Sequence, residues 1–260
     1  MWVAGAVLVS GVLQVAMLLP GLRSAGVRIA PSAGVRSPRT RRMVQLGIPV
    51  ALSAAVLQVS VLLDRSLAFF LADESGGAMA GMTPLAAGAA SRLGWAQFLY
   101  QFPLGVFAIA LATAIFPSLS RDAAIDDGRN DAFRQTVRRG VEAALFIGLP
   151  ASAGLLIVSH DATRVLFERG RFTPFDTRLV ATSVGVYSLA IWAFSLQQIV
   201  NRAYYALHET RLPMLWAGGN LAINLAVELP LIWLLPRPWG EVGMACGTLL
   251  SFAVQSLAML

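Results

Sequence analysis

Four polar side chains that can hold a cation lie inside otherwise apolar stretches of the sequence. Two are carboxylates, Asp64 and Glu228, and the others are the amide of Asn224 and the hydroxyl of Thr248. Such oxygen atoms are ligands of hard cations, and paired carboxylates can also pass a proton. The set therefore predicts a site for a sodium ion or a proton relay.

Helical spacing places these residues at one depth. Counted at 1.5 Å per residue from the end of each apolar stretch, Asp64 and Glu228 are each about 10 Å deep and Thr248 is about 9 Å deep. Asn224 precedes Glu228 by one helical turn, so the two share a helix face. A second interpretation stays open, in which Asp64 pairs with Arg65 or Arg92 and buried Glu228 carries a proton.

The stretches that hold these residues are long enough to cross a membrane. Of the 260 residues, 57% are apolar and 13% are charged, whereas about a quarter of the residues in soluble domains are charged. A span needs about 20 residues. The sequence predicts an all-α polytopic membrane protein with about seven transmembrane helices, a large soluble helical bundle being the alternative. The predicted spans are Met1–Leu22, Met43–Leu63 (extended to about Leu71), Leu93–Ser120 (beginning nearer Leu85), Ala143–Ser159, Val180–Asn201, Leu212–Pro236 and Val242–Leu260.

The distribution of arginine predicts the orientation of the spans. The loop from Pro20 to Arg42 carries six arginines and no acid, so we expect it in the cytoplasm. The loop with Asp73 and Glu74 is then outside, the basic loop 121–139 inside and the loop 160–178 outside. Loop arginines also predict contact with anionic membrane lipids. Because they are divided among short loops, we expect no nucleic-acid partner.

The segment Ser118–Arg139 mixes aspartate and arginine with apolar residues such as Phe133 and Val137. This mixture predicts an amphipathic helix at the membrane interface, with a solvated loop as the alternative.

The residue types needed for covalent catalysis are scarce. Cys246 is the single cysteine, and His160 and His208 are the two histidines, which excludes a disulfide framework and multi-cysteine metal sites. No nucleophile–base pair can be assembled around Cys246 or a serine. We therefore expect no enzyme, no catalytic residue and no cofactor beyond a coupling sodium ion, a proton or the membrane potential.

Four motifs in this sequence resemble those of one transporter family. Residues 101–121 read QFPLGVFAIALATAIFPSLSR, 62–68 read LLDRSLA, 166–173 read LFERGRFT and 204–213 read YYALHETRLP. In this order and at this spacing they resemble the MurJ/MviN lipid II flippases of the multidrug/oligosaccharidyl-lipid/polysaccharide exporter superfamily.

The resemblance implies a place within a fourteen-helix transporter. Residues 1–22 would form the last helix of the first lobe, 23–42 a basic cytoplasmic linker, and 43–260 a second six-helix lobe truncated at its C-terminus. Because both chain ends lie in apolar runs, we expect a fragment. The family implies carriage of lipid II, an undecaprenyl-pyrophosphate-linked peptidoglycan precursor, from the inner to the outer leaflet of the bacterial cytoplasmic (inner) membrane by alternating access.

The resemblance also implies arginines that bind the pyrophosphate of the substrate. The family has an arginine in its eighth helix, where an ungapped match places Phe98. Arg92 lies six residues earlier on the same predicted helix, and Arg65 is also at membrane depth. One guanidinium group can bind two phosphate oxygens at once. Arg92 and Arg65 are therefore the candidate substrate-binding residues. The alternatives are an exporter of another lipid-linked oligosaccharide or of a drug, and a non-transporting membrane scaffold.

Overall fold

The computed structural model describes residues 2–24, 37–72, 83–125 and 130–259. The chain divides into two units, Met1–Gln45 and Leu46–Leu260. The predicted linker 23–42 lies largely outside the described residues, as do Asp73 and Glu74. The helices are α1 (Trp2–Ser24), α2 (Pro38–Phe70), α3 (Ala89–Pro103), the π-helix η2 (Leu104–Ile109), α4 (Ala110–Ala123), α5 (Asp131–Phe167), α6 (Pro174–Ser188), α7 (Ile191–Ala206), α8 (Arg211–Leu234) and α9 (Gly240–Ala258).

The all-α polytopic fold is confirmed. Within the described chain, five helical segments are long and apolar enough to cross a membrane, and the bent pair α6 and α7 makes a sixth when counted as one span. The first predicted span, Met1–Leu22, corresponds to α1, which holds a shorter apolar helix over Val9–Leu18.

One predicted span is bent, and one prediction about an individual element is wrong. The predicted single span Val180–Asn201 is divided between α6 and α7 with a bend of 42°. At the break, the Leu189 and Ala190 amides donate to carbonyls three residues back, which tightens the turn and redirects the chain. The described residues of the segment Ser118–Arg139 form no separate interfacial helix, because α4 continues to Ala123 and α5 begins at Asp131.

Helix ends explain why α5 starts where it does. Asn130 has extended backbone angles, and its side chain accepts a hydrogen bond from the Phe133 amide. An N-cap of this kind satisfies an amide that the helix itself leaves unpaired. The charged residues of 131–139 are therefore the first turns of a 37-residue helix.

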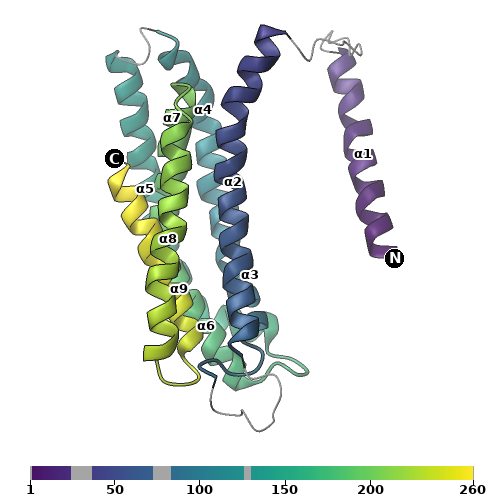
Figure 1. Cartoon of the computed structure of the whole chain (residues 1–260), viewed down its shortest axis with the longest axis vertical. Helices are drawn as coiled ribbons and strands as arrows, with labels where there is room; N and C mark the ends of the chain where they lie inside the picture. Colours follow the sequence, from purple (N-terminus) through teal and green to yellow (C-terminus); the bar gives the residue numbers. More distant parts are fainter. Residues whose placement is uncertain (1, 25–36, 73–82, 126–129, 260) are drawn as a thin grey trace. The chain divides into compact units, whose positions relative to one another are not determined.

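The largest apolar core cluster of the second unit lies at one end of the bundle. Leu85, Leu93, Val184, Ile232 and Met244 are almost fully buried in one cluster, which joins the start of α3, α6, the end of α8 and the start of α9. Figure 1 shows these segments at the lower end of the view. Following the predicted orientation, we call this the outer end and the opposite end, where α7 is followed by α8, the inner end.

Candidate functional site

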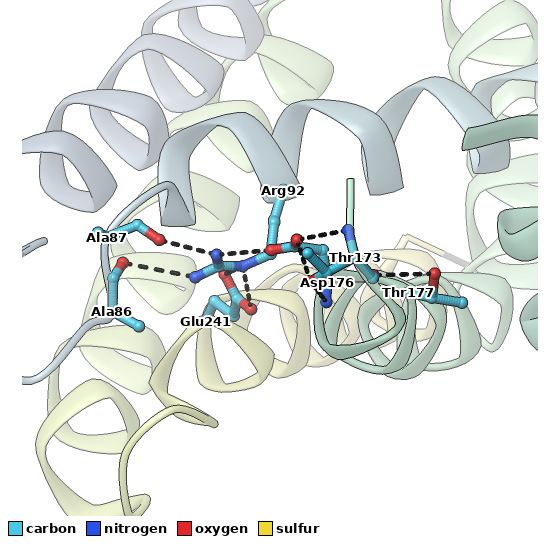
Figure 2. Close-up of polar contacts among 7 residues, drawn as sticks. All are labelled: Ala86, Ala87, Arg92, Thr173, Asp176, Thr177 and Glu241. Carbon is cyan, nitrogen blue, oxygen red and sulfur yellow. Dashed lines mark hydrogen bonds and ion pairs between the residues drawn. The ribbon is translucent and has the colours of Figure 1, made fainter. Parts of the chain in front are cut away.

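Arg92 is the centre of a buried ionic cluster at the outer end. Its Nε donates to both carboxylate oxygens of Glu241, at 3.0 and 3.1 Å, and its Nη1 donates to Asp176 Oδ1 at 3.3 Å. Nη1 also donates to the Ala87 carbonyl and Nη2 to the Ala86 carbonyl. Figure 2 shows the guanidinium held between these groups, which come from the start of α3, from α6 and from α9.

Both carboxylates of this cluster occupy the first turns of helices. Asp176 forms a capping box with Thr173, in which its side chain accepts from the Thr173 amide and the Thr173 hydroxyl accepts from the Asp176 amide. Glu241 is in the first turn of α9. Helix N-termini favour negative charge, so the two helices and Arg92 stabilise these carboxylates together.

The contacts of Arg92 differ from the second interpretation of the sequence, in which Asp64 pairs with Arg65 or Arg92. Its carboxylate partners are Glu241 and Asp176, and Asp64 is not among them. Arg92 is 6% exposed and directs its donors into the protein. In this conformation the guanidinium braces three helices, and its contact with a substrate stays a prediction.

The structure brings Asp64, Asn224 and Glu228 together below the protein surface. Their exposed fractions are 5%, 2% and 0%. The Asn224 Nδ2 donates to Asp64 Oδ1 at 3.4 Å and to Ser60 Oγ at 3.3 Å, which links α8 to α2. The Asp64 and Glu228 carboxyl groups are close neighbours in this group. We call Asp64 and Glu228 the acid pair and the Asn224 side chain the bridging amide.

A cavity of about 310 Å³ adjoins the acid pair and is lined by Asp64, Asn224 and Thr248 together with residues of α3 and α7. The Thr248 hydroxyl donates to the Met244 carbonyl at 3.3 Å, so its oxygen lone pairs remain available. Among the described residues, no hydrogen-bond partner contacts either Glu228 oxygen or Asn224 Oδ1. Buried oxygens without donors are what a cation or an ordered water requires.

Close packing of α9 on α8 fixes the position of the bridging amide. A Cβ added at Gly247 would lie 2.6 Å from Asn224 Oδ1 and 3.0 Å from the Glu228 Cβ. A side chain at position 247 would therefore require Asn224 and Glu228 to shift. No cluster of three or more histidine, cysteine, aspartate or glutamate side chains suited to a metal is present in the part of the chain that the structure describes.

The other two residues of interest are exposed. Arg65 lies on the exposed face of α2 and makes no ion pair within the described ranges. Phe98 is 66% exposed and lines an apolar hollow of about 710 Å³ with Phe102 and Phe107. At position 98, where the resembled family has an arginine, both the side chain and its surroundings are therefore apolar.

Sequence reasoning missed the carboxylates of the ionic cluster. Asp176 and Glu241 lie in segments that were read as a loop and as the edge of a span. A usable signal was present, because both acids fall within a few residues of a helix start and at the same end of the bundle as Arg92.

Comparison with known proteins places these features in a family. A family model described as "Lipid II flippase MurJ" matches residues 1–260. A "Probable lipid II flippase MurJ" of Rhizobium meliloti (strain 1021) is 35% identical over 225 residues, which cover 86% of this chain and 39% of that protein. One of Vibrio cholerae serotype O1 is 32% identical over 254 residues, covering 98% of this chain and 44% of that protein. The chain thus spans less than half the length of these relatives.

Solved structures show the same fold. "Lipid II flippase MurJ, inward closed conformation" is similar with a TM-score of 0.60 and 23% identity, over 66% of this chain and 35% of that one. An outward-facing multidrug resistance MATE family transporter of the MOP superfamily is similar with a TM-score of 0.69 and 18% identity, over 89% of this chain and 47% of that one.

Proposed function

The chain belongs to the MurJ family of lipid II flippases, multi-pass proteins of the bacterial cytoplasmic membrane, and on this premise we propose that it contributes the second lobe of a lipid II flippase. The complete protein moves the undecaprenyl-pyrophosphate-linked precursor from the inner to the outer leaflet by alternating access. The family match over residues 1–260 is the observation that carries the proposal.

The outer-end ionic cluster fits a lobe that moves as one body. Arg92, Asp176 and Glu241 join α3, α6 and α9, and the apolar core lies directly beside them. Alternating access needs lobes that rotate against each other while each keeps its internal packing. Transport of this kind forms and breaks no covalent bond in the substrate, so the proposed activity requires no catalytic residue.

Of the two candidate substrate-binding arginines, Arg65 is the one that is open to a ligand in this conformation. Because it is exposed on α2 while Arg92 is enclosed, the proposal places phosphate contact at Arg65 first and at Arg92 only if the cluster opens. Anionic lipids at the basic inner-end loops remain part of the proposal.

The acid pair is proposed to bind a small monovalent cation, sodium or a proton, that biases the conformation of the lobe. The residues fit such an ion, because two carboxylates and an amide oxygen converge without a balancing arginine or lysine. When bound, the ion supplies the positive charge that lets Asp64 and Glu228 remain close. Since Asp64 is on α2 and Glu228 on α8, their approach holds α2 against the rest of the lobe.

Rescue of a flippase-depleted bacterium by the complete gene tests the proposed transport. We expect growth and normal shape to be restored. If the protein inserts into the membrane but does not rescue growth, lipid II flipping is contradicted. Restored display of another lipid-linked oligosaccharide, or restored drug efflux, would then identify the exporter alternative. If neither is restored, the alternative of a non-transporting membrane scaffold is supported.

Thermal unfolding of the complete protein in sodium chloride and in choline chloride tests the ion. At ten times the dissociation constant, a bound ion adds about 1.4 kcal/mol of stability. We expect Glu228→Gln and Asp64→Asn to remove this difference, and Glu142→Gln, exposed on α5, to keep it. Equal stability in both salts, with transport still lost in Glu228→Gln, would identify a proton in place of sodium. Equal stability with transport intact would contradict the site.

A further inference from the structure

Two exposed residues line the cavity beside the acid pair. Of the residues that line it, Gln58 of α2 and Gln101 of α3 are exposed, and the others are buried or half-buried. The opening therefore lies between α2 and α3 at these two glutamines. We call it the α2–α3 mouth.

The α2–α3 mouth is polar although both helices are candidate membrane spans. Gln101 follows Gln97, which lines the same cavity, by one helical turn, so α3 carries a polar stripe from the buried interior to the exposed rim. Polar side chains at membrane depth face a bundle interior or an aqueous space, since exposure to hydrocarbon is costly. The mouth is consequently suited to face water.

A second cavity, of about 200 Å³, lies toward the inner end and is lined by polar residues that include Ser53, Asn201 and Gln255. Leu57 lines both cavities. The Phe194 and Phe252 rings meet edge to face at 5.4 Å and line the cavity beside the acid pair. The two cavities therefore share one apolar side chain in their walls, Leu57.

The charge of the inner cavity disfavours a cation. Arg202 lines it and no carboxylate does. The guanidinium is held in place, because its Nη2 donates to the Thr113 hydroxyl at 3.2 Å and its Cζ lies 5.5 Å from the centre of the Phe116 ring. A fixed positive charge repels a cation strongly where little water screens it.

We propose that a small monovalent cation reaches the acid pair through the α2–α3 mouth, from the aqueous space that Gln58 and Gln101 face, and that Leu57 and Arg202 close the route from the inner end. The inference rests on the cation site proposed above and adds its route of access. Because only 6% of the most apolar part of α2 is buried, that part of α2 can move relative to α3, while Ala68 near the end of the helix stays in the outer-end core. Separation of α2 from α3 thereby controls whether the ion exchanges.

Accessibility of a thiol at the floor of the cavity tests the route. Ser60 lines the cavity, and the complete protein carrying Ser60→Cys is modified with the small cationic reagent 2-aminoethyl methanethiosulfonate. We expect Gln58→Trp and Gln101→Trp to slow the reaction about tenfold, which corresponds to about 1.4 kcal/mol of added barrier. Ala54→Trp is the matched control, because Ala54 is an exposed α2 residue that lines only the inner cavity.

The native thiol reports on folding in the same experiment. Cys246 is half-buried on α9 and lines neither cavity, so its rate, resolved by peptide mass spectrometry, stays constant in a folded variant. The proposal is overturned if the rate at position 60 falls in Ala54→Trp or is unchanged in both glutamine variants. If the glutamine variants slow the reaction but sodium neither protects this thiol nor stabilises the protein, the route stands and the sodium site fails.

Discussion

Arg92 and Glu241 are 149 residues apart in the sequence and form an ion pair with a bifurcated hydrogen bond. The Arg92 Nε lies 3.0 Å from one Glu241 carboxylate oxygen and 3.1 Å from the other. Their side chains are 7% and 1% exposed. A buried pair contributes little net stability over an apolar pair of the same shape, but loss of one partner strands the other charge. The pair therefore fixes which helix ends meet at the outer end.

Removal of one partner of this pair is expected to be costly. Arg92→Met leaves Glu241 without its cation and should lower the free energy of unfolding by about 3–5 kcal/mol, whereas Arg92→Met with Glu241→Met should recover most of the loss. Arg138→Met is the control, because its pair with Glu142 is exposed and such pairs contribute about 0.3–0.5 kcal/mol. Thermal unfolding of the complete protein measures all three. A single-variant loss no larger than the control would contradict the bracing role.

The acid pair and the ionic cluster differ in how far the sequence could predict them. Asp64, Asn224 and Glu228 interrupt apolar runs. Their depth in the span and the helix face that they share follow from helical rise and periodicity alone. The partners of Arg92 depend instead on how the ends of α3, α6 and α9 are aligned, which depth counting cannot supply. The sequence allowed Arg92 to pair with Asp64, whereas the fold turns the guanidinium toward Glu241.

Gly247 should tolerate no side chain. Gly247→Ala places a Cβ 2.6 Å from Asn224 Oδ1, so α8 and α9 must separate, and we expect about 1–3 kcal/mol of destabilisation together with loss of sodium-dependent stabilisation. Gly218→Ala is the matched control on α8, because nothing lies within 4 Å of its added Cβ. At position 218, alanine gives the unfolded chain less backbone entropy than glycine does, which should stabilise the helix by about 0.5–1 kcal/mol. Similar unfolding temperatures for the two variants would contradict the close approach.

The same contrast between local pattern and tertiary alignment explains the wrong prediction for residues 118–139 and the bend within the predicted span Val180–Asn201. The mixed residues of 118–139 predict an amphipathic helix, but the described ones belong to the end of α4 and the start of α5. The bend between α6 and α7 involves Leu189 and Ala190, which carry no proline or glycine signal. Packing of α6 on the outer-end core supplies the direction that the local sequence lacks.

Arg65 is expected to matter for transport and not for stability. It is exposed on α2, so Arg65→Ala should change the free energy of unfolding by no more than about 0.5 kcal/mol while reducing rescue of the depleted bacterium. Arg65→Lys should rescue partly, because lysine keeps the charge but cannot contact two phosphate oxygens in the same way. Arg138→Ala controls for the loss of one surface charge. Full rescue by Arg65→Ala would remove this residue from the substrate path.

Thr248 separates ion binding from packing. Thr248→Val keeps the side-chain shape and removes one oxygen from the cavity together with a 3.3 Å hydrogen bond to the Met244 carbonyl. Thr182→Val is a matched control, because the Thr182 hydroxyl makes the same type of bond, at 2.9 Å to the Arg178 carbonyl, on the exposed side of α6. Each variant should lose at most about 0.5–1.5 kcal/mol through that bond. Only Thr248→Val should also raise the sodium concentration needed for half-maximal stabilisation, measured by thermal unfolding in a sodium titration. An equal sodium response in the two variants would exclude the Thr248 hydroxyl from the ion site.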